Sequence, residues 1–86
     1  SDLYATVEAR REIRFQGKDL PAYEVVIRKG PAEDARISHR IFIGEDGTPL
    51  RTVFKAGKTE YEIRLDHVQQ MNPADAKKWE WNVKKK

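Results

Sequence analysis

Apolar and polar residues alternate with a period of two along most of this chain, and short turns rich in glycine and proline interrupt the alternation. Strands that rest one face on a core show this pattern. It predicts a mostly β domain: about six antiparallel strands in meander order, strongly twisted into a half-barrel. The strands expected from the alternation comprise residues 3–15, 22–29, 36–43, 50–55, 59–66 and 79–83.

The first stretch is the longest and the least regular. Its odd positions are apolar except for Arg11. A helix capped by Asp2 is the competing interpretation, because alanine, glutamate and arginine favour helices. The apolar positions form no continuous helical stripe, so a strand is favoured. Its length predicts a bend or bulge near residues 9–11.

The alternation also predicts which side chains point inward. A slip of one residue would turn every side chain to the other face, so the apolar set is expected inside. The residues expected to be buried are Tyr23, Val25, Ile27, Ile37, Ile41, Ile43, Tyr61, Ile63 and Leu65. The residues expected in solvent are Glu24, Arg28, Arg36, Arg40, Glu62 and Arg64.

A short helical turn is expected near residues 73–78, just before the last strand. Asn72 suits the N-cap position, and Pro73 suits the first helical position because its missing N–H is not needed there. Residues 1–83 are therefore expected to form a single β domain, and residues 84–86 a frayed basic tail.

Composition and charge narrow the function classes. The chain has 86 residues, enough for one domain, and it has no cysteine, which excludes a disulfide framework and a thiol nucleophile. Its net charge is +3, which equals the charge of the tail, Lys84, Lys85 and Lys86. The body of the chain is neutral, whereas a nucleic-acid-binding surface usually carries a basic patch. No apolar run approaches the roughly 20 residues that a membrane span needs.

Catalytic or metal chemistry has little support in the sequence. His39 stands among isoleucines and is expected to be a partly buried structural residue, while His67 follows Asp66, whose side chain would point to the other face of a strand. No nucleophile or metal-ligand spacing accompanies either histidine. The glutamates alternate with arginines and are expected to pair across a solvated sheet face. The sequence thus predicts no catalytic residue, no metal and no cofactor.

The two tryptophans allow two interpretations. Trp79 and Trp81 fall on the same face of the last expected strand. They either fill a thin core or line a site for an apolar ligand. We expect a split, with one tryptophan structural and the other partly exposed.

Three segments resemble a known family. They are IRFQGKDLPAYEVVIRKG, ARISHRIFIGEDGTPLRTVF and YEIRLDHVQQMNPADAKKWEW. Each is similar to a strand-and-turn segment of the periplasmic lipoprotein-carrier-like (LolA-like) proteins and of the related sigma-factor regulators that sense mislocalised lipoproteins. The resemblance implies a curved sheet whose concave side receives acyl chains or the apolar segment of a partner, in a periplasmic or extracellular protein, with a cytoplasmic location left open.

A non-enzymatic binding module is the function expected from these observations. It would use the concave apolar sheet face, or an open strand edge, for a lipid-like ligand or a protein partner. The candidate ligand-binding residues are Val25, Ile27, Ile41, Phe54, Ile63, Trp79 and Trp81. Two alternatives stay open: a small basic β-domain that binds nucleic acid through Arg, Lys and aromatic side chains, and an accessory domain of a larger enzyme.

Overall fold

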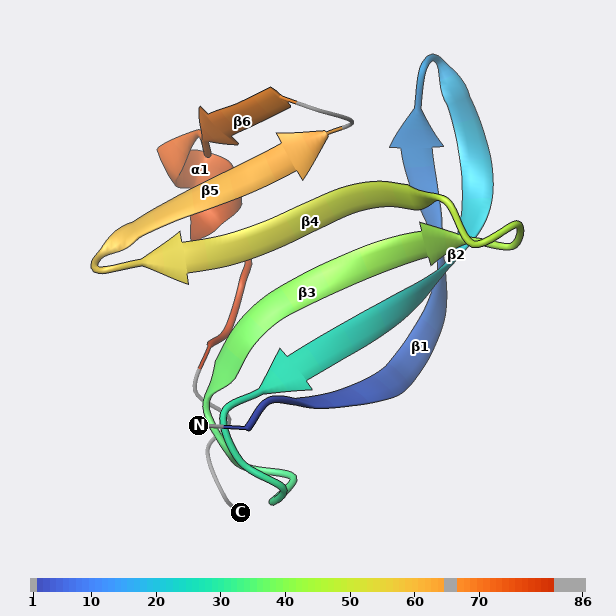
Figure 1. The fold of residues 1–86 in the computed structure, drawn as a ribbon. Coiled ribbons are helices and arrows are strands. Elements are labelled where there is room, and N and C mark those ends of the chain that lie inside the picture. The colour runs from blue at the N-terminus through green and yellow to red at the C-terminus, as the bar shows by residue number, and fades with distance from the viewer. Residues whose placement is uncertain (1, 65–66, 82–86) are drawn as a thin grey trace.

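The computed structural model of the chain describes residues 2–64 and 67–81 (Figure 1). One antiparallel sheet of six strands runs in meander order from β1 to β6 and does not close, which confirms the expected fold class. A helical turn, α1, follows the last strand. The strands are β1 (Tyr4–Phe15), β2 (Lys18–Arg28), β3 (Ile37–Gly44), β4 (Pro49–Ala56), β5 (Thr59–Arg64) and β6 (His67–Gln70), and α1 is Pro73–Ala76.

The sheet curls so that its first strand approaches its fifth. Arg64 of β5 donates from NH1 to the backbone oxygen of Arg14 in β1, at 3.3 Å. A β-bulge between Val7 and Ala9 helps, because the extra residue bends the strand and exchanges its two faces. The bulge lies just before the expected position, and it explains why Arg11 and Ile13 face inward while Ala5 and Val7 face outward.

The curl defines an inner face, which carries the core. Met71 and Trp81, on either side of α1, pack there against side chains of β2, β3 and β4, and Figure 1 shows α1 and the following segment on this one side of the sheet. Asn72 caps α1 by accepting from the backbone N–H of Ala74, as expected. The buried apolar residues of the strands include Ala22, Val26, Ile37, Phe42, Leu50 and Val53.

Two expected strand boundaries are wrong. β2 begins at Lys18 rather than at residue 22, because Gln16 and Gly17 make a two-residue turn with φ values of 51° and 79°. Pro21 lies within this strand. The sixth strand is β6, whereas Trp79 and Trp81 belong to an irregular segment after α1. The expected strand end at residues 82–83, Leu65 and the tail at residues 84–86 lie outside the described residues.

The expected burial register is also wrong on most strands. Val26 and Phe42 are buried, while Tyr23 is exposed and Val25, Ile27, Ile41, Ile43, Tyr61 and Ile63 are only half-buried. The buried face instead includes Glu24, Arg28 and Glu62, with Arg40 and Arg64 half-buried; the expectation holds for buried Ile37 and exposed Arg36. Both faces of β2 and β3 carry large apolar residues, so alternation alone cannot tell the inner face from the outer one. The inward charges are tolerated because they pair with one another.

Candidate functional site: a basic cleft on the inner face

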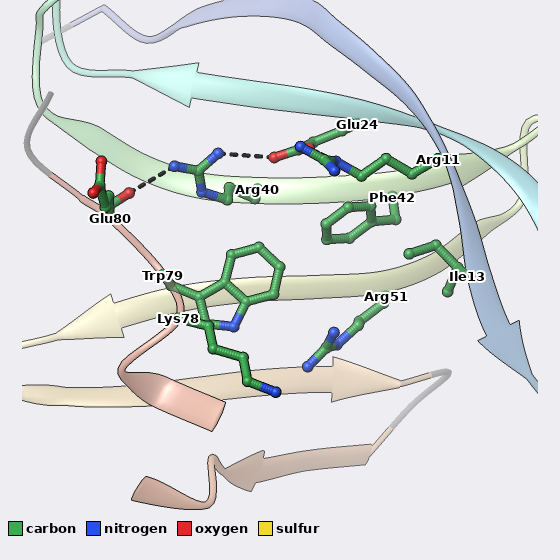
Figure 2. Close-up of a pocket in the computed structure, with 9 residues that line it drawn as sticks. All are labelled: Arg11, Ile13, Glu24, Arg40, Phe42, Arg51, Lys78, Trp79 and Glu80. Carbon is green, nitrogen blue, oxygen red and sulfur yellow. Dashed lines mark hydrogen bonds and ion pairs between the residues drawn. The ribbon is translucent and has the colours of Figure 1, made fainter. Parts of the chain in front are cut away.

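A cleft of about 390 Å³ opens on the inner face, between the sheet and the segment after α1 (Figure 2). Its walls come from three parts of the chain: the curled end of β1, the middle of the sheet, and residues 78–80. Figure 2 shows these side chains converging from separate elements. The lining residues are Arg11, Ile13, Glu24, Arg40, Phe42, Arg51, Lys78, Trp79 and Glu80.

Glu24 organises one wall of the cleft. Its side chain is only 3% exposed and accepts from two arginines, Arg11 through Nε and Arg40 through Nη1, the latter at 2.8 Å. Arg40 also donates from Nη2 to the backbone oxygen of Glu80, at 2.6 Å. Arg40 therefore links the sheet to the segment after α1 and holds that segment across the inner face.

Glu62 lies behind the opposite wall of the cleft and positions Arg51 there. Arg51 donates to its Oε2, while Arg64 and Gln69 donate to its Oε1 at 3.1 and 2.7 Å. Burial acts to raise the pKa of Glu62, but the hydrogen bonds and charge of Arg51, with the bonds from Gln69 and Arg64, outweigh it. The pKa of Glu62 is lowered as a result, so the carboxylate stays ionised and fixes Arg51 at the edge of the cleft.

Trp79 forms the floor between these walls. The guanidinium carbons of Arg40 and Arg51 lie 5.8 and 5.3 Å from the centre of its ring. The ring packs against Phe42 edge to face, with ring centres 5.8 Å apart. These cation–π and edge contacts stabilise the ring in place. The lining of the cleft therefore contains an apolar strip, made of Ile13, Phe42 and Trp79, next to cationic side chains.

Several donors on this lining have no acceptor within the described residues. Arg40 Nε is buried without a hydrogen-bond partner. Arg11 donates only through Nε, Arg51 donates through Nε and Nη2, and the exposed Lys78 makes only a 3.5 Å contact to Asp75. The lining holds four cationic side chains against two carboxylates, of which Glu24 is already shared by two arginines. The cleft can therefore offer hydrogen-bond donors and positive charge to an anion.

The structure divides the sequence-predicted site residues among three places. Trp79 lines the cleft, and Trp81 is buried in the core with 5% exposure, so the expected split of the tryptophans is found in their burial. The other five lie on the outer face of the sheet, away from the cleft. They are Val25, Ile27, Ile41, Phe54 and Ile63.

Sequence reasoning missed the arginines of the cleft: it assigned Arg40 to solvent and did not place Arg11 or Arg51 at a site. One signal was present: Arg11 breaks the apolar run of β1, at the position where it reaches Glu24. Long arginine stems can cover apolar surface while their heads pair, so an arginine on a strand does not by itself mark the solvent face.

The histidines take no part in this cleft. His39 lies on the outer face beside Phe54, with ring centres 5.6 Å apart, and Nδ1 contacts the Ser38 hydroxyl at 2.5 Å. Burial, and secondarily the charge of Lys29, lowers the pKa of His39, so the ring is neutral at pH 7. Among residues 2–64 and 67–81, no group of three acidic or histidine side chains is placed to hold a metal ion.

No family model matches the chain, and no curated protein or solved structure shows significant similarity to it. The described part of the chain has no helix with the length and apolar character to cross a membrane.

Proposed function

We propose that the protein is a non-enzymatic binding module whose inner cleft holds a small amphiphilic anion, a lipid-like molecule with a carboxylate or phosphate head and an apolar body. One observation carries the proposal: unused donors of Arg11, Arg51 and Lys78 line the same cleft as the apolar strip of Ile13, Phe42 and Trp79. The volume of the cleft, about 390 Å³, falls in the range of small-molecule sites.

The head group is assigned by charge and geometry. Arginine donors match the planar oxygens of a carboxylate or phosphate, and charge-assisted hydrogen bonds are about twice as strong as neutral ones. Glu24 and Glu62 hold Arg40 and Arg51 in position before a ligand arrives. Less side-chain ordering then opposes binding, which favours affinity.

The side chains on the floor of the cleft indicate that the rest of the ligand is apolar. The guanidiniums of Arg40 and Arg51 already lie over the Trp79 ring, where they compete with a nucleobase for stacking. An alkyl chain needs no free ring face and can lie along the partly exposed Ile13 and Trp79. This chemistry agrees with the lipid-like ligand that the resemblance to lipoprotein carriers implies, at a site built from other residues.

The test is a fluorescence titration, because Trp79 lies in the cleft and reports on its occupation. Octanoate is the probe, 1-octanol is its uncharged counterpart, and adenosine monophosphate represents nucleotides. We expect saturable binding of octanoate only, weakened about tenfold in Arg11→Gln/Lys78→Gln because two charge-assisted donors are lost. Lys18→Gln is the matched control, since Lys18 is an exposed cation at the start of β2, away from the cleft.

Equal binding of octanol and octanoate would overturn the head-group assignment, and so would full binding by Arg11→Gln/Lys78→Gln. Binding of the nucleotide in place of octanoate, weakening steeply with salt, would support the nucleic-acid alternative. Absence of any binding would overturn the proposed function.

A further inference from the structure

The segment after α1, residues 77–81, forms a strap across the inner face of the sheet (Figure 2). Three of its residues, Lys78, Trp79 and Glu80, line the cleft, so the strap supplies one wall of the candidate site. Its last residue, Trp81, is buried in the core. The cleft is therefore complete only while the strap is docked on the sheet.

Few contacts fasten the chain between Met71 and Trp81. These two residues are buried, and none of the residues between them is. Within residues 2–64 and 67–81, two hydrogen bonds join the strap to the sheet. Arg40 Nη2 donates to the backbone oxygen of Glu80 at 2.6 Å, and the backbone N–H of Ile37 donates to that of Trp81 at 2.8 Å. A segment with so little burial and so few bonds opens more readily than the strands beneath it.

The docked strap also leaves buried donors without acceptors. Arg40 Nε and Trp81 Nε1, both at the contact between the strap and the sheet, have no hydrogen-bond partner among the described residues. Solvent can hydrogen-bond both donors when the strap lifts away, whereas docking removes them from water with no protein acceptor in exchange. This cost opposes the gain from burying the Trp81 ring, so the docked and open states lie closer in free energy.

We propose that the strap opens and closes over the cleft while the sheet stays folded, and that a ligand in the cleft holds it closed. The opening is inferred from the strap contacts, and the effect of the ligand rests on the proposed function. The two are coupled because undocking removes Lys78 and Trp79 from the lining of the cleft. A ligand that binds only the closed state shifts the equilibrium toward it.

Arg40 is the positioning residue for the strap. Its Nη1 donates to the buried Glu24 and its Nη2 to the backbone oxygen of Glu80, so one planar guanidinium spans from the sheet to the strap (Figure 2). A lysine presents a single ammonium on a flexible stem and lacks this fork. Arg40→Lys therefore keeps a positive charge beside Glu24 and weakens the hold on the strap.

The amide of Ile37 reports whether the strap is docked. Ile37 is the first residue of β3, and its N–H donates to the strap. At the same end of the sheet, the N–H of Lys29 donates to the backbone oxygen of Arg36 at 2.9 Å, a bond that does not involve the strap. Hydrogen exchange of Ile37 relative to Lys29, followed by NMR without denaturant, therefore separates undocking of the strap from fraying of the sheet end.

The experiment compares exchange in the wild type, Arg40→Lys and Arg64→Lys. We expect the Ile37 amide to exchange at least about tenfold faster in Arg40→Lys, with Lys29 exchange unchanged, because a charge-assisted hydrogen bond to the strap is lost. Arg64→Lys is the matched control: Arg64 also joins a buried glutamate to a backbone oxygen, but neither acceptor belongs to the strap. In the wild type, octanoate at ten times its Kd is expected to slow Ile37 exchange about tenfold.

Equal exchange of Ile37 in the wild type and Arg40→Lys would overturn the inference. Faster exchange of Ile37 and Lys29 together, or the same acceleration in Arg64→Lys, would also overturn it, because the effect would then be a general loss of stability. Octanoate that binds in the fluorescence titration without slowing Ile37 exchange would overturn the coupling and leave the proposed function standing. Absence of octanoate binding would overturn the proposed function and the coupling with it, whereas the opening is decided by the variants without ligand.

Discussion

Arg51 donates from both Nε and Nη2 to one oxygen of Glu62, Oε2, at 3.0 and 2.6 Å. Glu62 is 7% exposed and points into the protein, while its chain neighbour Ile63 points to the outer face. The pair shows in one place how this sheet is built. Charged side chains occupy the inner face because each finds partners there, and aliphatic side chains remain outside.

Removing the Glu62 carboxylate is expected to destabilise the fold. In Glu62→Ala the largely buried Arg51 loses its counter-ion, and breaking a buried pair from one side typically costs about 3–5 kcal/mol. We expect the free energy of unfolding, measured in urea, to fall by about 3 kcal/mol. This is the low end of the range because Arg64, the other arginine paired with Glu62, is partly exposed to solvent. Glu60→Ala is the control, and its free energy of unfolding is expected to change by less than about 0.5 kcal/mol. Equal stability of the two variants would contradict the burial of this pair.

Acid is expected to destabilise the protein through the same carboxylate. The folded-state pKa of Glu62 is lowered, so the stability that it contributes is present above its ordinary pKa and is lost as pH falls through its folded pKa. Unfolding free energy is expected to fall from roughly pH 4.5 downward. Glu62→Gln, which cannot ionise, is expected to be less stable at pH 7 and to lose less stability on acidification. The same acid sensitivity in Glu62→Gln and in the wild type would assign the effect to other carboxylates.

The two tryptophans are expected to differ in their contribution to stability. Trp81 is in the core, and truncation of a buried aromatic typically costs about 3–5 kcal/mol. Trp79 is half-buried at the cleft, so Trp79→Ala is expected to cost about 1–2 kcal/mol. Denaturant titrations of both variants measure the difference. A cost for Trp79→Ala as large as that for Trp81→Ala would make Trp79 a core residue rather than the floor of an open site.

The strand pattern and turn residues were sufficient to predict the architecture. Alternation and the Gly-rich turns predicted the meander, and Asn72 with Pro73 predicted the start of α1. The sixth strand was misplaced because Trp79 and Trp81 alternate like strand residues. Their positions are instead fixed by the packing of the segment after α1 on the sheet, including the hydrogen bond from Ile37 N to Trp81 O at 2.8 Å.

The orientation of the sheet could not be predicted from periodicity. Val25 and Val26 are adjacent and equally apolar, so the alternation of β2 is compatible with either face inward. Which face points inward depends on features that alternation does not encode. These are the bulge at Val7–Ala9, the curl of β1, and the pairing of Arg40 with Glu24. The cleft depends on the same contacts, which explains why only Trp79 of the expected site residues lies in it.

Thiol labelling at Val25 and Val26 tests the orientation of the sheet most directly. The chain has no cysteine, so Val25→Cys and Val26→Cys each introduce a single thiol, with the same substitution at neighbouring positions. Val26 is 0% exposed and Val25 is half-buried on the outer face. Under native conditions we expect Val25→Cys to react with a maleimide at least about tenfold faster, because its thiol reaches solvent without unfolding. Faster labelling of Val26→Cys, or equal rates for both, would contradict a sheet with its charged face inside.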